Sequence, residues 1–194
     1  MNTIECRLCR RIETHLRELK IKYPSYHCKP VWGSGNLDSE LCIVGLAPGL
    51  HGANKTGTPF TADYSGLLMR EILDELNISN FFITNVVRCY PKNNLPFSDE
   101  KNNCQKHNDD EISKLQNLKV IITLGEVAYR QIIKLYGVSC SNKRFVHGNI
   151  IRLNDKVQLI SSYHCSKLNI NTNRVSKTML KKIFLKAIML TSHG

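Results

Sequence analysis

Four cysteines in this 194-residue chain have a spacing suited to metal ligation. Cys6 and Cys9 form a C-x2-C pair, and Cys89 and Cys104 follow far downstream. Gathered by a folded core, four thiolates make a site that accepts either zinc or a [4Fe–4S] cluster. Zinc sites usually take two close pairs, whereas the second pair here is widely spaced. The spacing therefore favours the cluster and leaves zinc as the alternative.

The other cysteines need no special role. The chain holds 8 cysteines, many for a reducing compartment, where disulfides are rare, so metal ligation is the natural use for some of them. Cys42 falls in an apolar run and is expected to be a small core hydrophobe. Cys28 and Cys140 fall in loops without an evident partner. The N-terminus carries charge and cysteine where a secretory signal has an apolar stretch, so we expect a cytoplasmic, nucleoid-associated protein.

Apolar patterning predicts helices alternating with buried strands. Short continuous apolar runs predict strands, and apolar residues three and four apart predict helices. Ser65 and Ser98 are expected to cap two of these helices. The strands are expected over 41–47, 81–87, 119–125, 149–154 and 157–164, and the helices over 4–20, 65–77, 98–117, 126–137 and 175–190. This order predicts one domain over 1–194, an α/β fold with helices on both faces of a mostly parallel sheet, that is, a three-layer α/β/α sandwich.

The loops that follow the strands should form one site. In open α/β sheets, ligands bind beyond the carboxyl ends of the strands. We therefore expect the loops beginning at Pro48, Arg88, Gly125 and Tyr163 to gather around a single crevice.

The charge balance indicates a polyanionic partner. The chain has 27 Lys and Arg against 16 Asp and Glu, a net charge of +11. Cations that contact phosphates release condensed counterions, which favours nucleic-acid binding. A basic protein with no such partner remains the alternative. No apolar run approaches the roughly 20 residues of a membrane span, so a membrane partner is not expected.

Three segments, taken with the cysteines, resemble the iron–sulphur uracil-DNA glycosylases. They are GLAPGLHGANKTGTPFTADYSG (45–66), TNVVRCYPKNN (84–94) and SSYHCSKLNINTNR (161–174). The resemblance implies hydrolysis of the N-glycosidic bond of uracil in DNA, and of other deaminated bases such as hypoxanthine, leaving an abasic site. It also implies a structural [4Fe–4S] cluster on Cys6, Cys9, Cys89 and Cys104, and a monomer whose partner is damaged DNA.

Within that family the chain is most similar to family 5, the broad-specificity branch. Family 4 has a glutamate at the position of Leu46, whereas Asp63 stands in the F-T-x-D segment as in family 5. Two residues depart from the pattern. Gly49 replaces a common alanine, and Cys165 replaces the proline of an H-P-S motif, which puts the stiffness of that loop in question.

The resemblance assigns a base pocket. Glycosylases turn the target nucleotide out of the duplex before they cut. Phe60 is expected to stack on the flipped base, and backbone amides around Leu46 and Ala47 to bind a uracil oxygen. The Asn85 amide can accept from uracil N3–H and donate to O4, a pattern that cytosine reverses.

The same resemblance assigns the chemistry and the DNA contacts. His164 is expected to donate to O2 as negative charge grows on the leaving base, and Asp63 to position or deprotonate water. Asp63 as a plain helix-terminal aspartate is the competing interpretation. The loop 165–174 is expected to enter the DNA with an apolar wedge, while phosphates are held by Ser166, Lys167, Asn169 and Arg174.

Two other functions are compatible with parts of the pattern. One is a catalytically silent DNA-binding module of the same fold, which needs none of Asp63, Asn85 and His164. The other is a small iron–sulphur electron carrier, whose cysteines usually form tighter runs.

Overall fold

The computed structural model describes residues 6–139 and 144–192, which share one six-stranded sheet. The strands are β1 (Ser34–Gly35), β2 (Leu41–Gly45), β3 (Phe82–Asn85), β4 (Val120–Leu124), β5 (Ile150–Arg152) and β6 (Gln158–Ser162). Their order is β1-β3-β2-β4-β6-β5. The four central strands are parallel, and the two short edge strands run antiparallel. The predicted mostly parallel sheet is confirmed.

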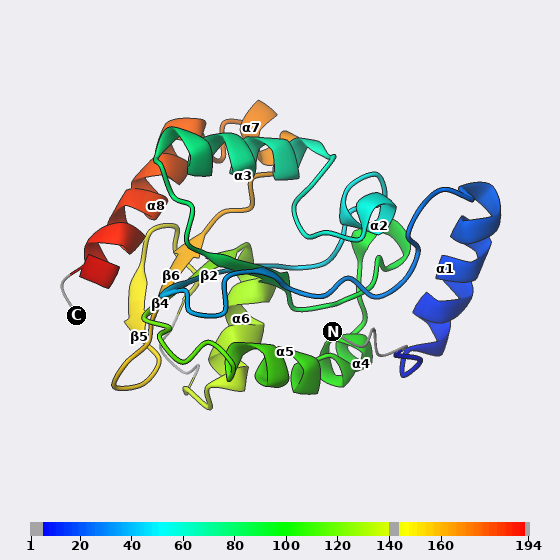
Figure 1. The fold of residues 1–194 in the computed structure, drawn as a ribbon, viewed down its shortest axis with the longest axis horizontal. Helices are drawn as coiled ribbons and strands as arrows, with labels where there is room; N and C mark the ends of the chain where they lie inside the picture. The colour runs from blue at the N-terminus through cyan, green and yellow to red at the C-terminus, as the bar shows by residue number, and fades with distance from the viewer. Residues whose placement is uncertain (1–5, 140–143, 193–194) are drawn as a thin grey trace.

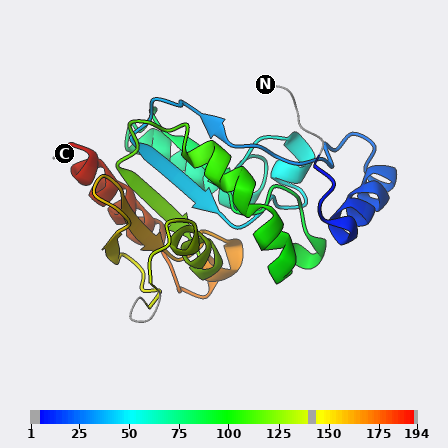
Figure 2. The same cartoon turned by 90° about the horizontal axis from the view of Figure 1, so that it is seen from below.

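Helices cover both faces of this sheet (Figure 1). They are α1 (Arg10–Lys22), α2 (Ala53–Thr56), α3 (Tyr64–Glu75), the 3-10 turn η1 (Lys92–Asn94), α4 (Ser98–Asn103), α5 (Gln105–Ile112), α6 (Glu126–Leu135), α7 (Lys167–Asn171) and α8 (Lys177–Ser192). Helices α3 and α8 lie on one face, and α5 and α6 lie on the other (Figure 2). The expected three-layer α/β/α sandwich is therefore confirmed.

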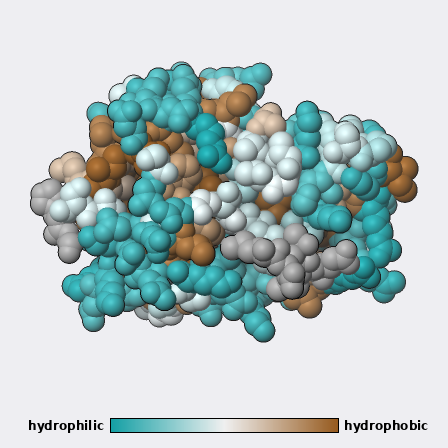
Figure 3. Space-filling view, viewed as in Figure 1, coloured by the Kyte–Doolittle hydropathy of each residue, from teal (hydrophilic) through white to brown (hydrophobic). Residues whose placement is uncertain are grey.

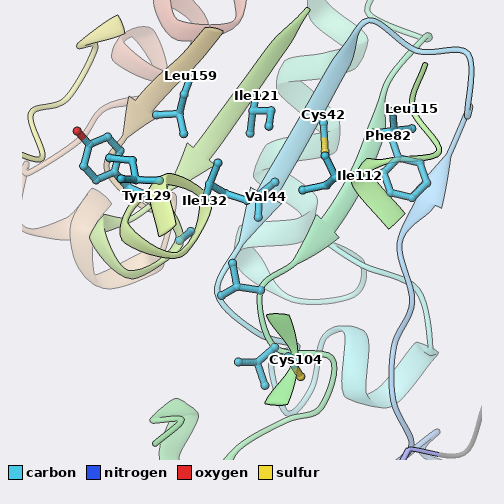
Figure 4. Close-up of a cluster of buried hydrophobic side chains, with 14 of the residues drawn as sticks. Cys42, Val44, Phe82, Cys104, Ile112, Leu115, Ile121, Tyr129, Ile132 and Leu159 are labelled. Carbon is cyan, nitrogen blue, oxygen red and sulfur yellow. The ribbon is translucent and has the colours of Figure 1, made fainter. Parts of the chain in front are cut away.

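Successive side chains of β2 point to opposite faces of the sheet, which explains why helices must cover both faces. Cys42 and Val44 point into the layer formed with α5 and α6, and Figure 4 shows them beside Ile112, Ile121 and Ile132. Ile43, between them, packs into the layer formed with α3 and α8. All three β2 side chains have 0% exposure. A strand buried on both faces reads as a continuous apolar run, which is why the sequence revealed it.

Two predicted helix starts are wrong. Asp63, not Ser65, is the N-cap of α3, because its extended backbone lets Oδ1 accept from Gly66 N at 2.8 Å. Aspartate caps as well as serine does. Ser98 is the first residue of α4, whose N-cap is Phe97. The helix expected through 117 is divided at Cys104, where Asn108 Nδ2 donates to the Cys104 carbonyl at 3.1 Å, and α5 ends at Ile112.

Short elements were missed inside expected loops. Helix α2 lies within 48–64 and α7 within 165–174, and both are too short for a periodic apolar signal. Helix α1 begins at Arg10, so Cys9 is its N-cap residue and Cys6 precedes it. Ile4, expected in that helix, and Cys140 lie outside the described residues. Over the described parts of the chain, no helix has the length and apolar character to cross a membrane.

Candidate active site

A small cavity lies where the loops after the parallel strands meet. Its volume is about 130 Å³. The residues that line it are Ala47, Pro48, Gly49, Ala53, Phe60, Asp63, Ser65, Asn85, Asn94, His164 and Ser166. Segments far apart in the sequence meet here because β2, β3 and β6 end at the same edge of the sheet. The loop beginning at Gly125 does not line the cavity, although a Cβ at Gly125 would lie 3.7 Å from His164 Cβ.

Asn85 ends β3 and presents its amide to the cavity. The residue is 3% exposed, and across the residues that the structure describes its side chain has no hydrogen-bond partner. Its amide atoms are not among the fully buried side-chain atoms that lack a partner, so they open onto the cavity and are available to a ligand. Gly45 on β2 makes the room for it. A Cβ at Gly45 would lie 2.5 Å from Asn85 Oδ1 and 2.6 Å from Phe60 Cζ.

Phe60 is held in a backbone conformation that side chains rarely adopt. Its φ is 51°, and its side chain is only 8% exposed. Arg70 Nε of α3 donates to the Phe60 carbonyl at 3.3 Å. Gly66 lets that backbone approach, since a Cβ there would lie 2.6 Å from Phe60 C. Strained residues persist only where their surroundings fix them, and they concentrate at ligand sites.

Asp63 lines the cavity and caps α3 at the same time. Oδ1 is engaged by Gly66 N, while Oδ2 faces the loop of Gly49 and Gly52. A Cβ at Gly49 would lie 2.5 Å from Oδ2, and one at Gly52 would lie 2.1 Å from it. The glycine that departs from the family pattern at 49 therefore leaves space for this carboxylate.

His164 follows β6 and faces the same cavity. Burial lowers the pKa of its imidazole, and the nearby Asp63 carboxylate opposes that shift. The ring is therefore neutral at physiological pH and retains one N–H donor. Asn169 Nδ2 donates to the His164 carbonyl at 2.8 Å and holds the backbone in place.

The cysteine at 165 does not loosen this loop. Cys165 has 0% exposure, and its Sγ donates to the Ser65 carbonyl at 3.6 Å. Burial raises the pKa of its thiol to about 12, so it stays protonated. The side chain packs against α3 and anchors the histidine that precedes it.

The four residues expected to bind DNA divide into two groups. Ser166 lines the cavity and caps α7, where its Oγ accepts from Asn169 N at 3.3 Å. Lys167 is exposed, and Arg174 is exposed with its guanidinium 4.9 Å from the centre of the Tyr163 ring. Of the four residues, Ser166 therefore lines the cavity and Asn169 supports the backbone of His164. Lys167 and Arg174 lie on the surface beside these two residues.

Of the two backbone positions expected near the base, Ala47 lines the cavity and Leu46 does not. The Leu46 carbonyl accepts from Val87 N at 2.9 Å, which continues the pairing of β2 with β3, and its side chain packs into the core. Sequence reasoning missed Asn94 and Ser65 as lining residues. Asn94 has φ 57°, and the Asn-Asn pair after Pro91 was the available turn signal.

A second cavity, of about 220 Å³, contains the four predicted ligand cysteines. Cys6, Cys9, Cys89 and Cys104 all line it, although they come from the N-terminal segment, the loop after β3 and the junction of α4 with α5. Burial, and to a smaller extent mutual repulsion, raises the pKa of the Cys89 thiol. Over the described ranges, no three His, Cys, Asp or Glu side chains lie close enough to hold one metal ion.

Comparison with known proteins agrees with the predicted resemblance. The sequence model of the uracil DNA glycosylase superfamily matches residues 32–188. A type-5 uracil-DNA glycosylase of Thermus thermophilus is 31% identical over 201 residues, covering 94% of this chain and 92% of that protein. One from Pyrobaculum aerophilum is 30% identical, covering 95% and 88%. A type-4 uracil-DNA glycosylase of Thermotoga maritima is 34% identical, covering 79% of each chain.

Proposed function

Because the chain belongs to the uracil DNA glycosylase superfamily, we propose that it hydrolyses the N-glycosidic bond of uracil in DNA and leaves an abasic site. The observation that carries the proposal is the shared cavity of Phe60, Asp63, Asn85 and His164, which includes a group for each task of the reaction.

The base pocket reads the edge of the flipped uracil. Phe60 supplies a ring for stacking, and its fixed backbone keeps that ring against the pocket. Asn85 accepts from N3–H through Oδ1 and donates to O4 through Nδ2. Cytosine presents a lone pair at N3 and an amino group at C4, so both hydrogen bonds fail and a buried amide is left unpaired. A backbone amide near Ala47 binds a further uracil oxygen.

Hypoxanthine fits the same amide. Its N1–H and O6 present a donor beside an acceptor, as N3–H and O4 of uracil do. We therefore include hypoxanthine and related deaminated bases among the proposed substrates, as the resemblance to the broad-specificity family 5 implies.

His164 and Asp63 divide the bond-breaking chemistry. The neutral imidazole donates a hydrogen bond to O2 as the departing base gains negative charge. Asp63 Oδ2, which accepts no hydrogen bond from the residues that the structure describes, positions the water that attacks the sugar and accepts its proton. Its Oδ1 stays on Gly66 N throughout, which fixes the carboxylate without using the reactive oxygen.

Helix α7 enters the DNA. Leu168 is 71% exposed at its first turn, although leucine is usually buried. It is the apolar wedge that fills the space left by the flipped base. Lys167, Ser166 and Arg174 contact phosphates around it, and Asn169 supports both tasks by holding His164. The proposed action is that of a monomer.

The four cysteines would hold a [4Fe–4S] cluster. The donor set fits, since four thiols from three segments line one cavity, and each gains stability as a thiolate when a cation is bound. A single zinc, with each sulphur about 2.3 Å from it, is the alternative occupant of the same four residues. When bound, the cluster supplies a structural cross-link. It ties the N-terminal segment to the loop after Asn85.

The proposed activity is tested with one uracil in a labelled duplex, followed by alkaline cleavage of abasic sites. We expect a cut at the uracil position and none in a matched thymine duplex. Tight DNA binding without any cut would favour the silent binding module. Neither binding nor cleavage would favour the electron carrier, whose signature is reversible reduction.

A further inference from the structure

A group of aromatic rings and exposed lysines lies beside the cavity, where the end of α1 meets α2. We call it the tyrosine–lysine surface, and it consists of Lys20, Lys22, Tyr23, Tyr26, His51 and Lys55. Figure 1 shows α1 and α2 beyond the carboxyl ends of the sheet, and Figure 3 shows mostly hydrophilic side chains over α1. The proposed reaction does not use any of these residues.

The rings form one rigid unit. Tyr23 and Tyr26 stack with their centres 4.7 Å apart and their planes 17° apart. The His51 ring stands edge-on to both, at 5.9 and 6.0 Å. The Tyr26 hydroxyl and His51 Nδ1 are 2.9 Å apart and share a hydrogen bond. Such contacts fix the rings beyond what burial alone would do.

The tyrosines position lysines whose ammonium groups form no ion pair within the described ranges. Lys22 Nζ lies 5.4 Å from the Tyr23 ring, and Lys55 Nζ lies 5.7 Å from the Tyr26 ring. Lys20 Nζ donates to the Tyr26 carbonyl. All three lysines are exposed, and within the described ranges none pairs with a carboxylate. Lys177 on α8, by contrast, pairs with Glu71 and Glu75. A cation held over a ring is ordered without being neutralised.

The surface continues directly from the cavity. Ala53 lines the cavity, and Lys55 follows it in the same helix. His51 stands in the loop that begins with the lining residues Pro48 and Gly49. Two backbone hydrogen bonds, His27 N to Lys55 O and Cys28 N to Asn54 O, both at 3.1 Å, join α2 to the segment after α1. A chain that leaves the cavity on this side therefore passes over ordered ammonium groups.

We propose that the tyrosine–lysine surface binds the phosphates of the DNA that flanks the flipped nucleotide. The inference rests on the proposed function, since it assumes that the cavity holds one nucleotide of a longer strand. Phosphates suit the site because its cations are fixed, unpaired and next to the cavity. Lys22 and Lys55 each contact one phosphate, and the tyrosines position them.

The test measures how duplex affinity depends on salt. Each phosphate contact contributes about −0.9 to the log–log slope in duplex DNA. Lys22→Ala with Lys55→Ala should make the slope shallower by about two units. The matched control removes Lys114, which follows α5, and Lys182, in α8. Both are exposed lysines, and α8 lies at the opposite end of the molecule from α1 (Figures 1 and 2). The control should keep the wild-type slope.

Three results would overturn the inference. They are an unchanged slope in the double variant, an equal loss in the control, and a loss that persists on a duplex too short to extend past the cavity. Wild-type protein that binds DNA but does not excise uracil would instead contradict the proposed function, and the slopes would still show whether this surface contacts phosphates. Tyr26→Phe, which removes only the hydroxyl bond to His51, should weaken binding less than the lysine changes do.

Discussion

Asp63 Oδ1 accepts a hydrogen bond from Gly66 N at 2.8 Å, so one carboxylate both begins α3 and lines the proposed active site. The two interpretations of Asp63, helix cap and catalytic group, are therefore compatible. Each oxygen has its own surroundings, and substitutions can separate the two roles.

Replacement of Asp63 should separate capping from chemistry. Asparagine caps about as well as aspartate, whereas Asp63→Ala should cost about 0.5–2 kcal/mol of stability. Asn cannot accept the proton of water, so both variants should lose about 10²–10⁴-fold in rate if proton abstraction dominates. If positioning dominates, Asp63→Asn should lose less. Single-turnover excision and thermal unfolding measure the two effects. A normal excision rate in Asp63→Ala would show that Asp63 acts only as the N-cap of α3.

The pKa of His164 should lie below the ordinary value for histidine. Burial lowers the pKa of the folded-state imidazole. The unfolded chain, with an ordinary histidine pKa of about 6.5, therefore takes up this proton at a higher pH than the folded protein does. The free energy of unfolding should consequently fall as the pH drops below about 6.5 towards the lowered pKa. Because the Asp63 charge opposes the shift, Asp63→Asn should lower the pKa further. An NMR titration of the ring in both proteins checks this. A raised pKa in the variant would contradict the proposed electrostatics.

Asn85→Ala should slow uracil excision while leaving the affinity for undamaged DNA almost unchanged. The amide reads the flipped base, whereas phosphate contacts lie elsewhere. Loss of its two hydrogen bonds should cost about 10- to 100-fold in rate. Excision rates and binding of a uracil-free duplex, measured together, distinguish this from a folding defect, which would reduce both equally.

Leu168→Ala should slow excision from a duplex by about tenfold and have little effect on single-stranded DNA, in which no pair needs opening. Because the side chain is 71% exposed, stability should change by no more than about 0.5 kcal/mol. Leu185→Ala, at another exposed leucine on α8, is the matched control and should be normal on both substrates. Equal slowing on both substrates would show that Leu168 is not a wedge.

The purified protein should be brown and contain about four irons. Cys89→Ala and Cys104→Ala should lose the colour and become insoluble, because ligand loss removes a folding constraint. Cys42→Ala is the control, since Cys42 is buried in β2 away from the cysteine cavity and should keep its iron. Metal analysis and the visible spectrum decide the assignment. A colourless protein with one zinc would rule out the cluster.

The sequence alone determined the sheet, its parallel core and the main residues of the site. Strands such as β2 are buried on both faces, so their sequences are unbroken runs of apolar residues. The order and spacing of the motifs likewise indicate Phe60, Asp63, Asn85 and His164, all of which line the cavity. These signals are local, and each is carried by consecutive residues.

Only the tertiary structure decided how those residues meet. Among the described residues no hydrogen bond engages Asp63 Oδ2, and this oxygen has room because positions 49 and 52 carry no Cβ. The helix expected through 117 is divided at Cys104, and α2 and α7 are too short for periodicity to reveal. The contacts of the Tyr23 and Tyr26 rings with His51 join two segments that no sequence pattern relates. Such contacts arise from packing between distant segments, which local propensity does not encode.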